Sequence, residues 1–241
     1  MKGFFDIHCH ILPGVDDGSG DLMTSMAMLK MEYGDGIRNI ILTPHFRHSM
    51  FENRAGDLVR QFDILKNKAE EVFPDLSLYL GCEVHQSSDM ADRLLDGKTL
   101  TMAGSDYVLV EFSGGDEKNL IRQRVREIQQ CGFIPVLAHV ERIETIRREL
   151  DFAVELKDVG VELQVNADTI IGKEGFFKKR FARQLMKEDL IDYVGSDAHG
   201  VKNRPPHMGE CMRQIEKSMG KAYARHLLIE NPSRILKNAA D

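Results

Sequence analysis

Seven short apolar runs recur along the chain, and a helical pattern follows each of them. The runs are residues 4–8, 39–43, 76–81, 107–111, 134–138, 162–165 and 193–195. Runs of this length, rich in Val, Ile, Leu and aromatic residues, predict buried strands. Strands that alternate with helices, without an internal repeat or a Pro/Gly-rich linker, predict an α/β fold with a parallel sheet. Periodicity alone does not decide whether that sheet is doubly wound or closed into a barrel.

The segments between the runs have the spacing of amphipathic helices. In residues 53–72, apolar side chains recur at intervals of three and four, at Leu58, Phe62, Leu65, Ala69 and Val72. Pro74 cannot continue this helix and predicts its end. Residues 21–33 and 118–131 follow the same pattern, and Gly132 is expected to cap the second of them.

Length and composition exclude several functional classes. A chain of 241 residues is expected to form one domain over residues 1–241, a size that α/β barrels commonly reach as a single unit. Its net charge of −6 and the absence of a basic tail exclude a nucleic-acid partner. An anionic substrate would therefore need local positive charge from metal ions or arginines.

Cysteine use and hydropathy indicate the cellular compartment. The four cysteines are scattered without a CxxC pair, which argues against a disulfide framework and a structural zinc site. No cationic leader and no hydrophobic signal segment are recognisable, and no apolar run approaches the roughly 20 residues that span a bilayer. We expect a cytoplasmic protein that does not insert into membranes.

The first apolar run closes on the sequence Asp-Ile-His-Cys-His at residues 6–10. Side chains alternate along a strand, so His8 and His10 are expected on one face and Ile7 and Cys9 on the other. Neutral imidazole is the commonest protein ligand for metal ions. The pair is therefore a candidate metal site, although such a short motif also arises by chance.

Five other runs also end in ionisable residues. The residues at or just after the ends of these runs are His45, Glu83, Glu111, His139, and Asp197 with His199. A buried ionisable group is costly unless it is paired or metal-bound, and parallel strands bring their carboxyl ends to one rim. The sequence therefore predicts a multinuclear metal site. Imidazole and carboxylate ligands without a thiolate suit manganese, iron or zinc.

Some neighbouring residues are interpreted more simply. Cys9 and Cys82 are expected to pack on the opposite strand face, and His85 and His226 to be exposed. The turn after the first strand contains Asp16 and Asp17, which are common turn residues but lie on the expected metal rim. Their spacing alone does not settle which aspartate would bind a metal.

These motifs resemble the polymerase and histidinol phosphatase (PHP) family. The sequences D-x-H-x-H-I-L-P-x-V-D-D-G at 6–18, A-H-V-E-R at 138–142, Q-V-N at 164–166 and S-D-A-H…R-P-P-H-M at 196–208 are similar to manganese-dependent protein-tyrosine phosphatases of bacterial capsule and exopolysaccharide loci. The likeness extends to Asn231-Pro232 and so covers essentially the whole chain. It implies a distorted, seven-stranded (β/α) barrel of the TIM type.

The resemblance also implies a trinuclear centre, with Mn²⁺ as the expected metal and Fe, Zn or Co possible in part. The first metal would be held by His8, His10, Glu83 and Asp197. The second would share Glu83 and be completed by Glu111 and His139. The third would be held by Asp17, His45 and His199, because the family uses the second aspartate of the pair.

The expected chemistry is hydrolysis of a phosphomonoester. Two metal ions about 4 Å apart can generate a hydroxide that attacks phosphorus in line with the leaving phenolate. Arg142 and Arg204 are suited to bidentate contact with phosphate oxygens, and Arg47 is a third candidate. The expected substrate is a phosphotyrosine-bearing protein, a tyrosine kinase of a polysaccharide-export system. No Cys-x5-Arg loop exists for a thiolate mechanism.

Three alternatives remain at this point. A small-molecule phosphatase acting on histidinol phosphate would use the same metal chemistry. A metal hydrolase of the amidohydrolase type would present a lysine on the fourth strand, where this chain has Glu111. A non-catalytic protein that binds phosphotyrosine would have lost ligands, and the motifs here are intact.

Overall fold

The computed structural model describes residues 3–239, and within them nine strands form two parallel sheets. The first sheet has the order β1-β2-β4, with the strands Phe4–Cys9, Ile37–Leu42 and Ser77–Leu80. The second has the order β3-β5-β6-β7-β8-β9, with the strands His45–Phe46, Glu83–His85, Tyr107–Glu111, Ile134–Leu137, Glu162–Asn166 and Tyr193–Gly195. The predicted α/β fold with a parallel sheet is confirmed.

The two sheets form one curled surface because they are connected on both sides. On one side, the Asp197 amide donates to the His8 carbonyl at 2.8 Å, and the His10 amide donates to the Ala198 carbonyl at 2.9 Å. On the other side the chain itself connects them, since β2 leads into β3 through Thr43 and Pro44, and β4 leads into β5 through Gly81 and Cys82. Each strand therefore has its carboxyl end at the same rim.

The predicted count of seven strands is not confirmed, because two further short strands, β3 and β5, follow the predicted strands at 39–43 and 76–81. β3 follows β2 after Pro44, which has no N–H group to donate to a sheet ladder. β5 follows β4 after Gly81 and Cys82. A Cβ atom on Gly81 would lie 3.0 Å from the Cα atom of Met102, so the close approach of these backbones requires glycine there.

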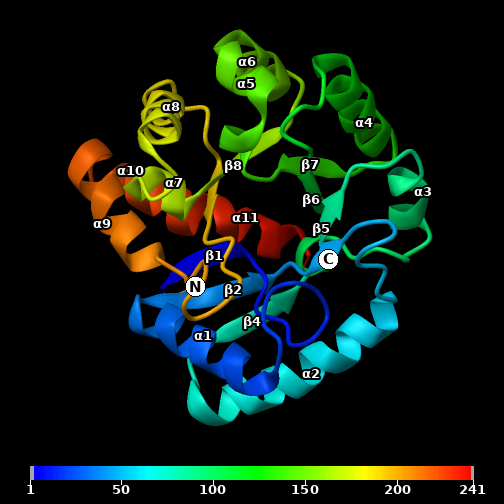
Figure 1. The fold of residues 1–241 in the computed structure, drawn as a ribbon, viewed down its shortest axis with the longest axis vertical. Coiled ribbons are helices and arrows are strands. Elements are labelled where there is room, and N and C mark those ends of the chain that lie inside the picture. The colour runs from blue at the N-terminus through cyan, green and yellow to red at the C-terminus, as the bar shows by residue number, and fades with distance from the viewer. Residues whose placement is uncertain (1–2, 240–241) are drawn as a thin grey trace.

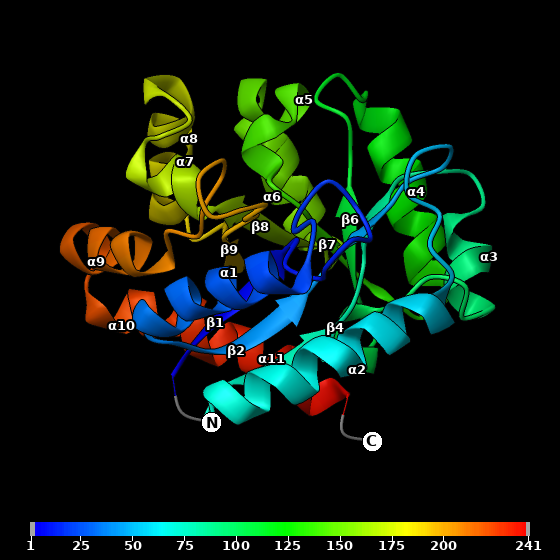
Figure 2. The same ribbon diagram turned by 60° about the horizontal axis from the view of Figure 1, so that its bottom comes forward.

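Helices surround the curled sheet (Figures 1 and 2). They are α1 Leu22–Gly34, α2 Ala55–Val72, α3 Met90–Leu95, α4 Lys118–Gln130, α5 Glu144–Arg148, α6 Leu150–Asp158, α7 Ala167–Ile171, α8 Phe176–Lys187, α9 Met208–Met219, α10 Lys221–Arg225 and α11 Asn231–Asn238. Short turns of other helix types cover Met102–Gly104, Val140–Arg142 and His226–Glu230. None of the described helices has the length and apolarity needed to cross a bilayer.

The three helices predicted from apolar spacing are confirmed to within two residues at each end. α1 begins after Asp21, whose carboxylate accepts from the Thr24 amide at 2.7 Å as an N-cap. α4 ends before Gly132, which has a φ of +85° and so provides the expected left-handed cap.

The core has two layers, one on each side of the curled sheet. The inner layer contains Phe5, Ile7 and Tyr193 from the strands, and Ile235 and Leu236 of α11 pack against them. The outer, larger layer lies between the strands and the surrounding helices. Figure 2 shows α11 below the strands, so this helix closes the end of the sheet opposite the rim that carries the polar residues.

A β-bulge in β1 changes the predicted alternation. Asp6 pairs with Ile40 and Cys9 pairs with Leu42, so β1 contains one residue more than β2 over the same stretch. Ile7 consequently packs in the inner layer while Cys9 packs in the outer layer. The expectation that Ile7 and Cys9 share a face is wrong, because simple alternation does not hold across a bulge.

Candidate metal centre

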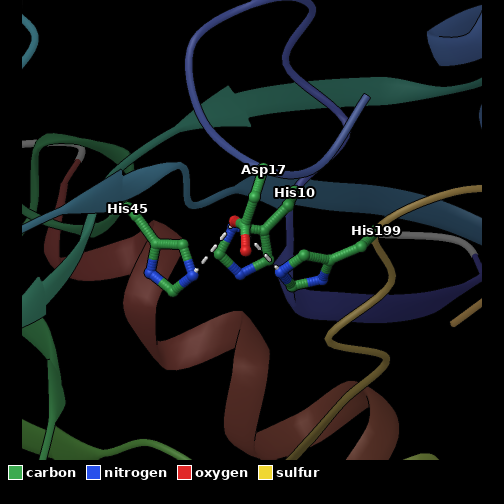
Figure 3. A group of neighbouring side chains, drawn as sticks. All are labelled: His10, Asp17, His45 and His199. Carbon is green, nitrogen blue, oxygen red and sulfur yellow. Dashed lines mark ion pairs between the residues drawn. The ribbon is translucent and has the colours of Figure 1, made fainter. Parts of the chain in front are cut away.

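The ionisable residues that end the strands meet at one rim of the curled sheet. Figure 3 shows Asp17, from the loop after β1, between the imidazoles of His45 and His199, with His10 beside them. The Asp17 carboxylate lies 3.5 Å from Nε2 of His45 and 3.6 Å from Nε2 of His199. Ligand-type atoms of these four residues lie within 4.8 Å of one another, a spacing that a metal ion can bridge.

Glu83 is the centre of the remaining residues. One of its carboxylate oxygens lies 3.3 Å from Nε2 of both His8 and His10, and 3.0 Å from Nδ1 of His45. The other oxygen accepts a hydrogen bond from Nε2 of His139 at 2.9 Å. Glu83 is fully buried, so this carboxylate can only be compensated by the imidazoles or by a metal ion.

The other candidate ligands join the same cluster. Asp197 groups with His8 and His10, and Glu111 groups with His45 and Glu83. The carboxylate of Glu111 also lies 3.9 Å from Nε2 of His139. The structure therefore brings together all nine candidates, namely His8, His10, Asp17, His45, Glu83, Glu111, His139, Asp197 and His199.

Unpartnered atoms in this cluster support metal binding. His45 Nδ1, Glu83 Oε2, Glu111 Oε2 and His199 Nε2 are buried and have no hydrogen-bond partner among the described residues. His45 Nδ1 and Glu83 Oε2 are only 3.0 Å apart, yet their geometry is not that of a hydrogen bond. Buried polar atoms without partners are costly, whereas atoms that converge on a shared point can share a cation. The donor set of imidazole and carboxylate fits a divalent metal.

The charges in the cluster shift the pKa values of its members. Burial raises the pKa of Glu83, but the charge of His8 and the nearby imidazoles of His10 and His139 bring it well below its usual value. The pKa of Asp197 also lies well below its usual value, because the effects of His10 and His8 outweigh that of burial. Burial lowers the pKa of His10, but its hydrogen bonds to carboxylates outweigh burial and raise it well above its usual value. The carboxylates are thus ionised and require positive charge, from protons on imidazole or from metal ions.

The two aspartates after β1 have different surroundings. Asp16 accepts from Nδ1 of His10 at 2.8 Å and from the His45 amide at 2.9 Å, so its carboxylate is already occupied. Asp17 is half-exposed and directed between His45 and His199. The pKa of His199 is lowered to about 3 by burial and by the charge of His10, so its imidazole is neutral and can act as a ligand. Asp17 is therefore the better candidate.

Two backbone conformations at the rim are unusual. His139 has a φ of +33° and Asp197 a φ of +52°, both in the left-handed region that disfavours residues with a side chain. Such strain costs about 1–3 kcal/mol at each position and persists only where the surroundings impose it. Here it turns both side chains toward the cluster.

The sequence analysis gave no role to two buried amides that orient this cluster. Gln164 Oε1 accepts from Nδ1 of His8 at 3.1 Å and from the His139 amide at 2.8 Å. Its Nε2 donates to Asn166, which donates in turn to Asp197 at 2.8 Å. Because an amide oxygen only accepts, Gln164 holds the proton at Nδ1 of His8 and leaves Nε2 free as a ligand. In the sequence, Gln164 stands between Leu163 and Val165 in an apolar run, and this isolated polar residue was the available signal for a buried amide.

Gln164→Leu should lower the affinity for the activating metal by about 10–100-fold, the usual effect of losing a partner that orients a metal ligand. The substitution leaves Nδ1 of His8 and the His139 amide without an acceptor. Competition with a fluorescent chelator measures the affinity. Gln164→Glu keeps an acceptor and is the matched control. An unchanged affinity in the leucine variant would contradict this role.

Two of the three candidate arginines lie at the cluster. Nη1 of Arg142 and Nη2 of Arg204 lie 2.8 Å and 2.6 Å from the same oxygen of Asp197. Arg142 also binds the Glu174 carboxylate at 2.7 Å, which the sequence analysis did not consider. Arg47 lies in the short hairpin that pairs it with Phe51, and the described residues give its side chain no ion pair.

Four further predictions concern single residues near the rim or on the surface. Cys9 and Cys82 pack in the hydrophobic core as expected. His226 lies on the surface, as expected. His85 is half-buried rather than exposed, because its Nε2 is hydrogen-bonded to the Ser113 hydroxyl at 3.1 Å.

Comparisons with known proteins agree with this geometry. A family model described as "Capsular polysaccharide synthesis, CpsB/CapC" matches residues 4–237. The chain is 34% identical over 239 residues to the tyrosine-protein phosphatase CpsB of Streptococcus agalactiae serotype III (strain NEM316), covering 97% of this chain and 98% of that protein. It is 32% identical over 233 residues to the tyrosine-protein phosphatase YwqE of Bacillus subtilis (strain 168), covering 97% and 91% of the two chains.

Solved structures are also similar to this chain. One match comes from a study of YwqE from Bacillus subtilis and CpsB from Streptococcus pneumoniae, described as unique metal-dependent tyrosine phosphatases. It has a TM-score of 0.91 and 32% identity, and the alignment covers 97% of this chain and 94% of that one. A phosphotriesterase homology protein of Escherichia coli, with a TM-score of 0.63 and 13% identity, shares the fold alone.

Proposed function

The chain belongs to the CpsB/CapC family of capsular polysaccharide synthesis proteins, and we propose that it is a metal-dependent protein-tyrosine phosphatase that hydrolyses phosphotyrosine in proteins. The relatives named above are tyrosine-protein phosphatases, and the structural match is described as metal-dependent. The observation that carries the proposal is the cluster around Glu83, where imidazole and carboxylate atoms converge without satisfying one another.

We propose that the cluster holds three metal ions, with manganese as the physiological metal. His8, His10, Glu83 and Asp197 would hold the first, and Glu83, Glu111 and His139 the second. Asp17, His45 and His199 would hold the third. When bound, divalent cations would screen the phosphate oxygens as Lewis acids and lower the pKa of water, the nucleophile of the hydrolysis.

The protein's own residues would bind and orient the phosphate. Each guanidinium has five N–H donors, so Arg142 and Arg204 can contact Asp197 and still offer donors to a phosphate. Such contacts suit the planar, bidentate geometry of arginine. We propose Arg47 as a third contact that acts at the edge of the site.

The proposed protein substrate is a tyrosine kinase of a polysaccharide-export system, in the cytoplasm, where such kinases meet their ATP. The family's link to capsular polysaccharide synthesis supports this choice. We further propose that the chain forms one domain whose strands make a single distorted, seven-stranded barrel of PHP type. In this barrel β3 and β5 are continuations of β2 and β4, which lie two residues before them.

A substrate panel tests the proposal. With manganese present, a phosphotyrosine peptide should be hydrolysed faster than a phosphoserine peptide and faster than histidinol phosphate. A preference for histidinol phosphate would instead identify a small-molecule phosphatase. A solved histidinol phosphate phosphatase of Lactococcus lactis shares the fold at a TM-score of 0.58 and 13% identity, and this likeness shows the fold alone.

Arg204→Ala and Arg142→Ala should each reduce kcat/KM, because each loses one charge-assisted contact worth about 1.5–3 kcal/mol. We expect the loss in both kcat and KM, since the contact exists in substrate and transition state. Arg47→Ala should have a smaller effect. Metal content should stay unchanged, because Asp197 keeps Asn166 and the other arginine as partners. If elemental analysis shows metal loss in parallel with activity, the arginines support the metal site and do not bind phosphate.

A further inference from the structure

The exposed side of α8 is unusually basic and aromatic. This helix begins with Phe176 and Phe177, whose exposed fractions are 72% and 81%. The apolar side of α8, which includes Phe181 and Leu185, is buried in the core. The two phenylalanines are therefore not needed for packing within the described part of the chain.

A shallow, open hollow of about 700 Å³ runs along the exposed face of α8. We name it the α8 groove, lined by Phe176, Lys179, Arg180, Arg183, Gln184 and Lys187, with Glu188 at its end. A second hollow shares Lys179 and Arg183 with it and adds Lys217 of α9. The two hollows contain five cations and one carboxylate.

The charges of this groove are not compensated. Arg180, Arg183, Lys187 and Lys217 form no ion pair with any residue in the range 3–239. Other surface cations do, such as Arg38 with Asp75 at 2.9 Å. Uncompensated positive charge on one face of a chain with a net charge of −6 indicates a surface that attracts anions.

A chain of ion pairs links the first turn of α8 to the metal centre. Lys178 binds Glu174 at 2.8 Å, and Glu174 binds Arg142 at 2.7 Å, which in turn contacts Asp197. Phe177 follows Glu174 by three residues, which span at most about 11 Å of chain. A peptide whose phosphotyrosine lay at the metal centre could therefore continue over the phenylalanines into the groove.

The shape of this surface favours a peptide over a membrane. A helix that binds a lipid surface exposes an apolar stripe along its length. The exposed apolar residues of α8 are confined to its first turn, and the remaining apolar residues face the core. Lys179 and Arg183 of α8 also line the second hollow together with Lys217 of α9, and a hollow between two helices fits an extended chain better than a flat lipid headgroup layer.

We propose that the α8 groove binds an acidic segment of the phosphotyrosine-bearing protein, next to the tyrosine that is dephosphorylated. The carboxylates of that segment pair with Arg180, Arg183 and Lys187, and its apolar side chains contact Phe176 and Phe177. This inference rests on the proposed phosphatase function. It adds a second recognition surface that selects the protein substrate by charge.

The test compares two phosphotyrosine peptides with eight residues on each side, a reach of roughly 26–29 Å when extended. In one the flanking residues are rich in glutamate, and in the other glutamine replaces glutamate. The wild type should hydrolyse the acidic peptide with a kcat/KM at least about fivefold higher, an effect expected of a few exposed charge contacts. The preference should vanish near 0.5 M salt, roughly, because salt screens exposed charges.

The variant that combines Arg180→Ala, Arg183→Ala and Lys187→Ala should lose this preference through a higher KM for the acidic peptide. Its activity on p-nitrophenyl phosphate should stay at the wild-type level. The matched control combines Arg60→Ala, Lys66→Ala and Arg126→Ala, three exposed cations on α2 and α4. This control should keep the preference. Equal treatment of both peptides by the wild type, or a preference that survives in the groove variant, overturns the proposal.

Two further measurements distinguish failure of the docking proposal from failure of the proposed phosphatase function. Fluorescence anisotropy measures binding of the acidic peptide with phenylalanine in place of phosphotyrosine, so it reports on the groove even if no phosphatase activity exists. Loss of this binding in the groove variant supports the docking proposal, whatever the outcome for the reaction. Sedimentation with phosphatidylglycerol vesicles tests the membrane. If the groove variant loses only vesicle binding, the surface is a lipid site and the proposal is wrong.

Discussion

A strong chelator is expected to abolish hydrolysis of an aryl phosphate, and addition of manganese to restore it. The buried cluster around Glu83 offers imidazoles and carboxylates but no thiolate, and the pKa of the nearby Cys82 is raised to about 12 by burial. Reaction without a metal would therefore lack an activated water nucleophile, and only the arginines would be left to screen the phosphate charge. We expect a loss of at least about a thousandfold, because metal ions supply several kcal/mol of transition-state stabilisation.

The measurement is the rate of p-nitrophenyl phosphate hydrolysis after dialysis against chelator, with metal content determined on the same sample. Circular dichroism on the stripped protein controls for unfolding. Re-addition of manganese, zinc and iron in separate samples ranks the metals. Full turnover by a preparation shown to be free of metal would contradict the proposed function.

His139→Ala and Glu111→Ala should each reduce kcat by more than about a hundredfold while leaving the fold intact. His139 lies 2.9 Å from one oxygen of Glu83, and Glu111 extends from β6 toward the same carboxylate. Loss of either removes a proposed ligand of the second metal, an effect larger than the 10–100-fold seen for residues that only orient ligands. Residues at the carboxyl ends of barrel strands support chemistry more than stability.

His85→Ala is the matched control for these two variants. His85 lies at the same rim on β5, is half-buried, and is hydrogen-bonded to Ser113 without joining a metal group. Its replacement should leave kcat close to the wild-type value. The comparison uses kcat with manganese at micromolar levels, together with thermal unfolding. Near wild-type kcat in His139→Ala or Glu111→Ala would contradict the assignment of the second metal.

Much of the fold could be predicted because burial leaves a clear pattern in the sequence. The strands Tyr107–Glu111 and Tyr193–Gly195 have the predicted bounds, since continuous apolar runs mark strands buried on both faces. The breaks after β2 and β4 were less visible. Pro44 and Gly81 carry the signal, but only the register of β3 and β5 shows that the chain continues in a second sheet.

The arrangement inside the candidate site was harder to predict. His8 and His10 were expected on one face, and they meet around Glu83. The bulge between Asp6 and Cys9 was not expected, because an extra residue in a strand changes no residue type. The roles of Asp16 and Asp17 separate only when their distances to His10 and His45 are known.

The sequence by itself determined which residue types end the strands, and therefore the kind of chemistry at the rim. Parallel strands must bring their carboxyl ends together, so His and Glu at those ends had to meet. Only the tertiary structure decided which partners they meet. Gln164 reaches His8 from 156 positions away, and Glu174 reaches Arg142 across 32. Such contacts depend on how the curled sheet closes and how helices pack on it, which periodicity along the chain does not encode.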